Sequence, residues 1–400
     1  MSAEIVQMKA RGFICVNAHP AGCALNVERQ IAAVRSAIPA PLPGIRTALI
    51  IGASTGYGLA SRLVSAWGFG ARTLGVFFER PPAAGRTATA GYYNTAAFHA
   101  AARRDGLAAC SINGDAFSDA VRRQALERIA RDLGPLDLVI YSLASPKRTD
   151  PRTGVTYSSV LKPVGRPFSS RTIDLDRARL TEVTLEPAAP EEVAATVAVM
   201  GGGDWRLWIE ALLEANLLAP GARTLAYSYI GPELTWPIYK DGTIGQAKND
   251  LFRAARELDA RLQASLGGHA WVSVNKAIVT QASSAIPVVP LYLSLLLRVL
   301  REHRQDEDAV AQIIRLAQDH LASAPRFDSE GRIRLDDREL QPAVQAAITG
   351  LWPQVTTENL REITDFNRFE RGFRNLFGFE VEGVDYAAPA ELDGGAVIFS

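Results

Sequence analysis

A short apolar run that leads directly into a glycine-rich turn restricts the fold of this chain more than any other feature. Residues 47–51 (TALII) have the composition of a strand buried on both faces, residues 52–58 (GASTGYG) form the turn, and residues 59–64 continue with helical character. Small residues at such a turn let backbone N–H groups and a helix N-terminus approach a diphosphate. The pattern predicts a nucleotide site in a parallel α/β sheet, although a purely structural turn would use the same glycines.

Strand-like segments recur along the chain and alternate with helical segments. After the first strand they lie at residues 73–78, 107–112, 136–142, 223–230 and 271–280. This alternation is typical of an α/β fold with a Rossmann-type, doubly wound parallel sheet. Turn-rich sequence interrupts it between about residues 147 and 220, which indicates helical and hairpin insertions that cover the active site.

We expect a single large domain over residues 1–400. Its parts would be an N-terminal extension packed on the core at 1–44, the Rossmann core at 45–282, and a mostly helical region covering the substrate at 283–400. The apolar stretch 285–297 contains two prolines and is shorter than the roughly 20 residues of a membrane span. We therefore interpret it as a buried or ligand-facing helix and expect no stable membrane insertion.

Composition excludes several classes of function. The 400 residues include 43 basic and 43 acidic side chains and are 48% hydrophobic, which is typical of a soluble globular protein and argues against bulk nucleic-acid binding. Cys15, Cys23 and Cys110 form neither a CxxC pair nor a His/Cys cluster with metal spacing, so we expect no metal site and a reducing cytoplasm. Residues 1–11 hold no apolar run, and we expect no secretory signal.

Acidic residues at two predicted strand ends suggest which nucleotide binds. Glu79 lies about 20 residues beyond the glycines, where an acid bonds a free adenosine ribose and repels a 2′-phosphate, so NADH is predicted over NADPH. Arg80 follows directly and would weaken that discrimination. Asp115 and Ala116 follow the third strand, where they would contact adenine. Asp115 as the N-cap of the helix predicted from Ser118 is an equally economical explanation.

Tyr239 and Lys248 are the best candidates for chemistry. Nine residues at 3.6 per turn correspond to about 900°, so on one helix the two side chains would point to opposite sides. Thr243 and Gln246 form a capping-box pattern, which predicts that a helix starts at Thr243 and that Tyr239 lies in the loop before it. Lys248 falls on or beside the apolar stripe, where a phenol or a ribose would suit it, and its charge would favour the phenolate of Tyr239 and ease proton donation. A snorkelling lysine and a packing tyrosine explain the pattern equally well.

Taken together, the motifs resemble the FabV/TER family of NADH-dependent trans-2-enoyl-ACP and trans-2-enoyl-CoA reductases, which are short-chain dehydrogenase/reductase-like. The glycine spacing G-x-x-x-G-x-G and the spacing Tyr-x8-Lys both fit this family. The resemblance covers nearly the whole chain. Its segments are residues 11–15 (RGFIC), 18–23 (AHPAGC), 52–58 (GASTGYG), 76–80 (VFFER), 111–118 (SINGDAFS), 141–146 (YSLASP), 199–202 (VMGG) and 276–287 (KAIVTQASSAIP).

The resemblance implies roles for individual residues. Tyr239 would stabilise an enolate and support its protonation, Lys248 would hold the ribose and tune the phenol, and Tyr229 would contact the substrate. No motif in the chain requires FAD, so FAD is not expected, although a flavin-binding label has been attached to the family's C-terminal region. The family's NADH contacts correspond to Gly52, Ala53, Ser54, Thr55, Gly56, Tyr57, Phe78, Glu79, Asp115, Ala116, Leu143, Ala144, Lys248, Ile278, Val279 and Thr280.

The activity implied by the resemblance is the last step of the fatty acid elongation cycle. NADH would reduce the trans-2 double bond of a 2-enoyl thioester carried by acyl carrier protein or CoA. Hydride would reach the β-carbon, and the resulting enolate would be protonated at the α-carbon. We further expect a cytoplasmic monomer.

Two other functions remain open from the sequence. A 3-ketoacyl or alcohol reductase of the short-chain class would share the fold and the cofactor, but its usual Tyr-x3-Lys is absent, since Lys240 and Lys248 are the only lysines close after Tyr239. A protein that senses NADH without catalysis is the second alternative. Loss of the tyrosine or the lysine would have favoured it, and both are present.

Overall fold

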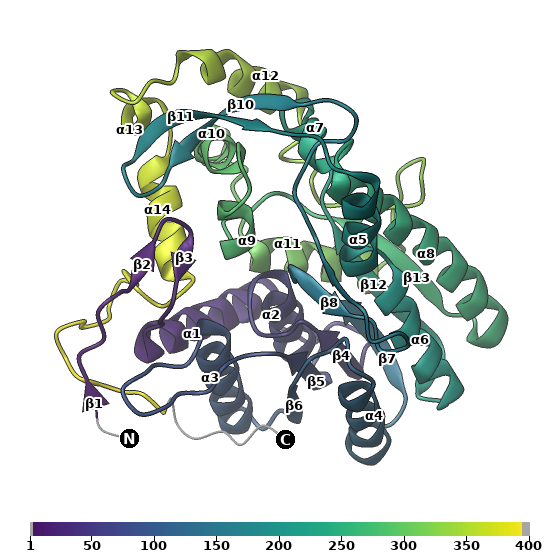
Figure 1. Ribbon diagram of the computed structural model, residues 1–400. Helices are drawn as coiled ribbons and strands as arrows, with labels where there is room; N and C mark the ends of the chain where they lie inside the picture. The colour runs from purple at the N-terminus through teal and green to yellow at the C-terminus, as the bar shows by residue number, and fades with distance from the viewer. Residues whose placement is uncertain (1–2, 394–400) are drawn as a thin grey trace.

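A seven-stranded parallel sheet runs through the structure, a computed structural model that describes residues 3–393 (Figure 1). Its strands are β4 (Thr47–Ile51), β5 (Arg72–Phe77), β6 (Ala109–Asn113), β7 (Leu136–Tyr141), β12 (Leu218–Ser228), β13 (His269–Val274) and β14 (Ile333–Arg334). Their order across the sheet is β14-β13-β12-β7-β4-β5-β6, so the direction of winding reverses between β4 and β7. The predicted α/β fold with a Rossmann-type, doubly wound sheet is confirmed.

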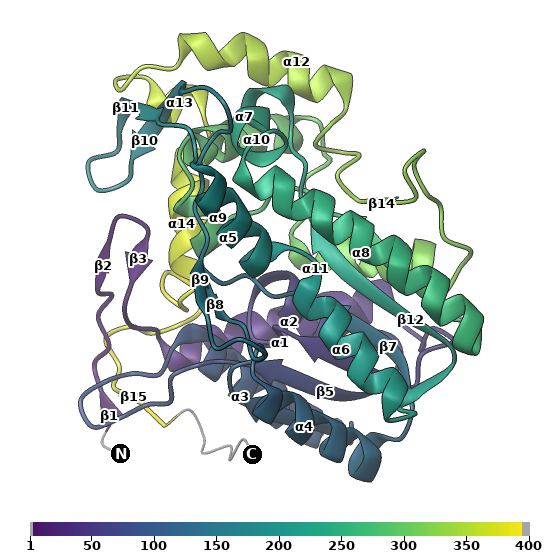
Figure 2. The ribbon, with the colours of Figure 1, turned by 45° about the vertical axis from the view of Figure 1, so that its right-hand side comes forward.

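Helices cover both faces of this sheet. Figure 2 shows α4, α6 and α8 in front of it and α1 and α2 behind it. All five residues of β4 are buried because apolar clusters fill the space on either side. The helices behind the sheet are α1 (Pro20–Ala37), α2 (Gly56–Leu63), α3 (Ala90–Arg104) and α11 (Ala309–Leu316), and those in front are α4 (Asp119–Arg128), α6 (Gly203–Glu214) and α8 (Thr243–Leu266). The π-helical turns η1 (Val64–Gly68), η2 (Ile129–Leu133) and η4 (Ala317–Leu321) extend α2, α4 and α11.

A second group of elements lies above the sheet in Figure 1 and encloses its own apolar cluster. The cluster includes Tyr239, Tyr292 and Phe366, which come from distant parts of the chain. The group contains the turns η3 (Glu233–Thr235) and η5 (Trp352–Gln354) and the helices α7 (Trp236–Tyr239), α9 (Gln281–Ser284), α10 (Val289–Glu302), α12 (Pro342–Leu351), α13 (Leu360–Ile363) and α14 (Phe366–Asn375). None of the helices within residues 3–393 has the length and hydropathy needed to cross a bilayer.

Two hairpins occupy the segment where the sequence predicts a hairpin-bearing insertion. The second of them, residues 168–185, packs against α10, as Figure 1 shows. Helix α5 (Pro190–Met200) follows the hairpins and packs against α8. The hairpin strands are β8 (Lys147–Thr149) with β9 (Thr156–Ser158), and β10 (Phe168–Asp174) with β11 (Arg179–Leu185).

The two ends of the described chain meet. Strand β1 (Ala3–Glu4) pairs with β15 (Ala390–Glu391), and β2 (Ala10–Arg11) forms a small hairpin with β3 (Ile14–Cys15). Helix α1 begins at Pro20, because Nδ1 of His19 accepts a hydrogen bond from Gly22 N and caps the first turn.

Two strands of the core sheet have boundaries that differ from those expected from the sequence. The fifth strand in chain order, β12, starts at Leu218 rather than 223, because Leu218 pairs with Leu136 before the register shifts. The sixth, β13, ends at Val274 rather than at 280. Residues 275–280 form a loop. Asn275 N still bonds the Ser228 carbonyl of β12 at 2.9 Å, whereas the backbone of Lys276 and Ala277 is held by side chains from other elements.

Candidate active site

The glycine loop has the tight packing that an approach to a dinucleotide requires. A Cβ atom at Gly52 would lie 2.1 Å from the Ser142 carbonyl oxygen, and one at Gly58 would lie 1.8 Å from the Gly52 oxygen. Gly56 has φ +52° and open space where a Cβ would point. Thr55 is the N-cap residue of α2, and its side chain makes no capping hydrogen bond, which leaves N–H groups of the first helical turn without that partner. These features fit the diphosphate of a nucleotide at the helix N-terminus.

The acid predicted to select NADH is held in place at the end of β5. Its Oε1 accepts a hydrogen bond from the Ser54 hydroxyl at 2.7 Å, while Asn113 bonds both the N–H and the carbonyl of Glu79 at 2.8 Å. Burial raises the pKa of the Glu79 carboxyl, with the hydrogen bonds from Thr89 and Ser54 acting in the opposite direction. The ring of Phe78 is 77% exposed beside it and offers an apolar face for a base.

Asp115 does not cap the following helix, so that interpretation is wrong. Ser118 caps α4 by accepting from Val121 N at 3.2 Å, whereas Oδ1 of Asp115 accepts from Phe117 N at 3.0 Å within the turn. Asp115 stays partly exposed at the strand end, and Ala116 is buried beside it. After the end of β7, the predicted contact Leu143 is partly exposed and the predicted contact Ala144 is exposed.

Tyr239 is the last residue of the short helix α7, not part of a loop as predicted. A proline at the start of α7 is compatible with a helical first turn. The Tyr239 ring meets the ring of Tyr229 edge to face, with centroids 4.7 Å apart and planes at 83°. Burial, and then the charge of Glu339, raise the pKa of the Tyr239 phenol. This shift is opposite in direction to the one that the sequence predicts for a phenol beside the ammonium of Lys248.

Lys248 lies in the second turn of α8, on the stripe predicted for it. Its Nζ donates to the Tyr227 carbonyl at 3.3 Å, and burial lowers the pKa of Lys248 to about 8. Helix α8 starts at Thr243 as predicted, but the capping box is wrong. The N-cap is Gly242, because the Thr243 hydroxyl bonds the insertion backbone at Val160.

The loop after β13 is bonded to the glycine loop. Tyr57, from the glycine loop, donates its hydroxyl to the Lys276 carbonyl at 2.6 Å. Ile278, Val279 and Thr280 are partly exposed. The Thr280 hydroxyl accepts from Ser283 N at 2.9 Å and caps α9, so its side chain already has a structural role.

Residues 86–322 match the sequence model of the trans-2-enoyl-CoA reductase catalytic region, which is more than half of the chain. The chain belongs to the trans-2-enoyl-CoA reductase family. Residues 5–84 match the family's NAD(P)H binding domain, and residues 327–390 match the model described as the enoyl reductase FAD binding domain.

Relatives of this family resemble the chain over nearly its whole length. An enoyl-[acyl-carrier-protein] reductase [NADH] from Opitutus terrae is 55% identical, covering 97% of this chain and 98% of its own. A trans-2-enoyl-CoA reductase from Euglena gracilis is 51% identical, covering 98% of this chain and 72% of its own. The crystal structure of the Treponema denticola trans-2-enoyl-CoA reductase in complex with NAD is 45% identical, covers 96% and 98% of the two chains, and has a TM-score of 0.93. The resemblance drawn from the motifs is thus confirmed.

Because residues 327–390 match a model described as FAD binding, the expectation that this chain binds no FAD is not confirmed. A cleft of about 670 Å³ beside α14 is lined by carboxylates of Asp176, Glu370 and Glu380. The positive charge that lines the cleft belongs to Arg374, which already pairs with Glu370 and Glu380. A flavin dinucleotide carries a diphosphate, which these carboxylates would repel, so this cleft does not fit that group.

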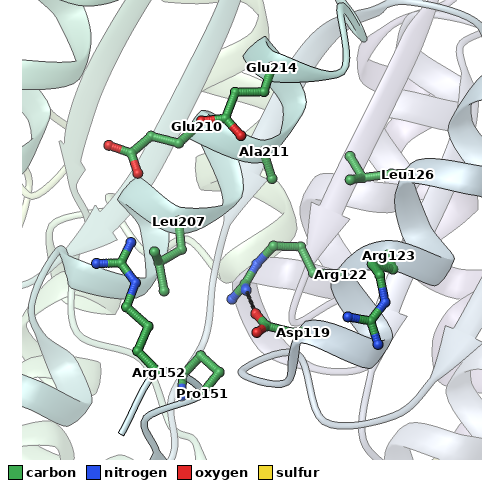
Figure 3. Close-up of a pocket in the computed structure, with 10 residues that line it drawn as sticks. All are labelled: Asp119, Arg122, Arg123, Leu126, Pro151, Arg152, Leu207, Glu210, Ala211 and Glu214. Carbon is green, nitrogen blue, oxygen red and sulfur yellow. Dashed lines mark hydrogen bonds and ion pairs between the residues drawn. The ribbon is translucent and has the colours of Figure 1, made fainter.

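A smaller cleft of about 300 Å³ lies away from the candidate site, between α4 and α6 (Figure 3). Arg152 and Pro151, from the turn between β8 and β9, form its third side. Arg122 points into it and pairs with Asp119 there, and a second nitrogen bonds the buried Asp204 at 3.0 Å. Arg122 and Asp119 therefore already have partners within the fold, as does Glu210, which pairs with Arg261 at 3.1 Å.

Sequence reasoning in this enoyl reductase missed Glu339. Its carboxylate is fully buried and accepts hydrogen bonds from Tyr229 and Tyr292. It lies in the run Asp336-Asp337-Arg338-Glu339, which has the composition of a solvated surface. No pattern in that run marks one of its four residues as buried.

Proposed function

We propose that this chain reduces the trans-2 double bond of acyl thioesters with NADH. The observation that carries the proposal is a cluster of candidate residues at one edge of the sheet. Buried Tyr239 lies against Tyr229, Lys248 lies on the next helix, and the glycine loop follows a parallel strand of the same sheet. The Opitutus relative, named for enoyl-ACP and NADH, and the Euglena relative, named for enoyl-CoA, support it.

We propose that NADH is the cofactor, and that its nicotinamide supplies the hydride when it is bound. Ser54, Thr55, Gly56 and Tyr57 would hold the diphosphate through backbone N–H groups. Gly52 and Ala53 would shape the turn beneath it, because their N–H groups bond the Val76 carbonyl at 2.8 and 3.0 Å. Glu79 would accept hydrogen bonds from the free ribose in place of the one it accepts from Ser54, and its charge would disfavour a 2′-phosphate. The remaining proposed contacts are Phe78, Asp115, Ala116, Leu143, Ala144, Lys248, Ile278, Val279 and Thr280.

Tyr239 would stabilise the negative charge that develops on the thioester oxygen. A phenol with a raised pKa keeps its proton near neutral pH and can donate a hydrogen bond to an enolate oxygen as that charge forms. Such an interaction is stronger in the transition state than with the bound substrate, and this difference raises the rate. The ammonium of Lys248 would add positive charge on the same side.

The acyl chain would lie against the apolar group above the sheet. This group includes Ile238, Ile286 and Leu291, which are at most 7% exposed, around α10. We leave both carriers, acyl carrier protein and CoA, within the proposal, and we propose a cytoplasmic monomer.

The test is NADH oxidation with crotonyl-CoA and, in parallel, with acetoacetyl-CoA. We expect NADH to be consumed with crotonyl-CoA only. Consumption with the ketone alone would identify a 3-ketoacyl reductase. NADH binding without turnover of either thioester would identify an NADH sensor. A second comparison, crotonyl-ACP against crotonyl-CoA at equal concentrations, measures which carrier is preferred.

A further inference from the structure

Glu339 brings a carboxylate from the C-terminal region into the interior beside the candidate site. It lies between β14 and α12, and its exposed fraction is 0%. A carboxylate buried so completely is costly unless donors surround it. The arrangement of its donors therefore indicates what the carboxylate does.

Three hydrogen bonds hold both oxygens of Glu339. Oε1 accepts from the Tyr229 hydroxyl at 2.8 Å and from the Tyr292 hydroxyl at 2.7 Å. Oε2 accepts from Ala277 N at 2.7 Å. Burial raises the pKa of the Glu339 carboxyl, while these hydrogen bonds and the ammonium of Lys276, itself 3% exposed, act in the opposite direction. All three donors suit an ionised carboxylate, which only accepts hydrogen bonds.

These donors come from three elements that meet at the candidate site. Tyr229 follows β12, Tyr292 lies on α10, and Ala277 belongs to the loop after β13 whose next three residues are proposed cofactor contacts. Tyr229 in turn packs edge to face on Tyr239. One carboxylate thus connects the loop that carries proposed NADH contacts with the Tyr229 ring, which packs on the phenol of Tyr239.

The single proton of Tyr229 limits what that residue can do. A phenol has one O–H to donate, and in this structure Glu339 accepts it. Tyr229 therefore cannot donate to a thioester oxygen while it keeps this bond, and that task falls to Tyr239. Tyr229 retains a role as the wall that orients the Tyr239 ring.

We propose that Glu339 is a positioning residue for enoyl reduction, whose carboxylate fixes Tyr229 against Tyr239 and anchors the Ala277 amide of the cofactor loop. The inference rests on the proposed function. It assigns to the segment matched by the flavin-domain model a contribution to the NADH-dependent site. Gln345, on α12, supports the arrangement, because its Nε2 donates to the Tyr292 hydroxyl at 3.2 Å and to the Glu339 carbonyl at 2.6 Å.

The test is a double-mutant cycle on the full-length chain with NADH and crotonyl-CoA. Glu339→Gln keeps the shape of the side chain but replaces one acceptor by an NH2 donor, which faces a donor at either position. We expect kcat to fall at least about tenfold in Glu339→Gln and in Tyr229→Phe. Both substitutions remove the hydrogen bond between Tyr229 and Glu339. The kcat of the double variant should therefore lie within about twofold of the kcat of the slower single variant.

The matched control is Asp336→Asn, three residues earlier. Asp336 is also 0% exposed, but its carboxylate pairs with Arg334 at 2.8 and 2.7 Å. The Asp336→Asn substitution should lower the urea midpoint at least as much as Glu339→Gln does, and should leave kcat within about twofold of the wild-type value. Glu339→Gln with wild-type kcat, or losses that multiply in the double variant, would overturn the proposal.

If Glu339→Gln is not recovered folded, the network is tested from its donors. Tyr292→Phe removes the hydroxyl that does not lead to Tyr239, whereas Tyr229→Phe removes the one that does. The proposal expects a kcat loss below about threefold for the former and at least about tenfold for the latter, and equal losses contradict it. Wild-type protein that fails to reduce crotonyl-CoA would instead refute the proposed function.

Discussion

The ammonium of Lys248 should destabilise the unliganded fold, so removing its charge should stabilise the protein. Lys248 is partly buried, and its hydrogen bond goes to a backbone carbonyl, that of Tyr227 at 3.3 Å. Burial lowers the pKa of Lys248 from 10.5 to about 8. At about 1.36 kcal/mol per pKa unit, this difference amounts to roughly 3 kcal/mol of destabilisation at neutral pH.

We expect Lys248→Met, which keeps an apolar stem without the charge, to raise the free energy of unfolding at pH 7. Losing the bond to Tyr227 costs about 1 kcal/mol, which leaves a net gain of roughly 2 kcal/mol. In the wild type the penalty is fully present below about pH 8 and is relieved as pH rises toward 10.5, where the unfolded lysine also loses its proton. The gap between variant and wild type should therefore close over that range.

The assay is urea unfolding without NADH, followed by tryptophan fluorescence at pH 7, 9 and 10.5. Other lysines titrate in the same window, but they cancel in the difference between variant and wild type. Lys162→Met is the control, because the Lys162 ammonium pairs with Glu192 at 2.7 Å in a partly exposed position and its removal should not stabilise the fold. A Lys248→Met protein less stable than wild type at pH 7, or a gain independent of pH, would refute the reasoning.

Three further outcomes follow from the site. Tyr239→Phe should lower kcat by about 100-fold or more with little change in NADH affinity, because the ring stays in place while the hydroxyl is lost, and steady-state kinetics with NADH titration check this. Glu79→Gln should raise kcat/KM with NADPH relative to NADH, since the repelling charge is gone; an unchanged ratio would contradict the assignment. Gly56→Ala should fold, with about 1 kcal/mol of backbone strain, and bind NADH more weakly, whereas Gly58→Ala should unfold at much lower urea because its methyl group would lie 1.8 Å from the Gly52 oxygen.

The parts of the fold that depend on short-range pattern could be predicted from the sequence. The run 47–51 and the turn at 52–58 identify β4, the glycine loop and α2 because a buried parallel strand and a tight turn leave local signatures. The predicted capping box at Thr243 is wrong because a long-range contact replaces it. Its hydroxyl bonds Val160, some 83 residues away, and a local pattern cannot show that competing partner.

The sequence predicts a strand through residue 280 because Ile278, Val279 and Thr280 are β-branched. In the fold, Asn275 N makes a last bond to β12 at the Ser228 carbonyl. The backbone groups of the next two residues bond Tyr57, Gln312 and Glu339 instead, so the chain leaves the sheet there. Three contacts from three distant segments decided a conformation that intrinsic propensity assigned differently. A local pattern cannot show such contacts, although the prediction that Ile278, Val279 and Thr280 contact NADH did not depend on them.

The apolar cluster around Tyr239 argues that the segment boundaries of the family models are not physical boundaries. The catalytic-region match ends at residue 322, yet Phe366 and Phe369, at most 1% exposed, belong to the same cluster as Tyr239. Glu339 lies beyond that boundary as well and bonds Tyr229 directly. A chain cut after residue 322 would lose this carboxylate and uncover the apolar surface on which α7 and α10 pack. The chemistry proposed for Tyr239 therefore depends on residues that local sequence comparison assigns to a different function.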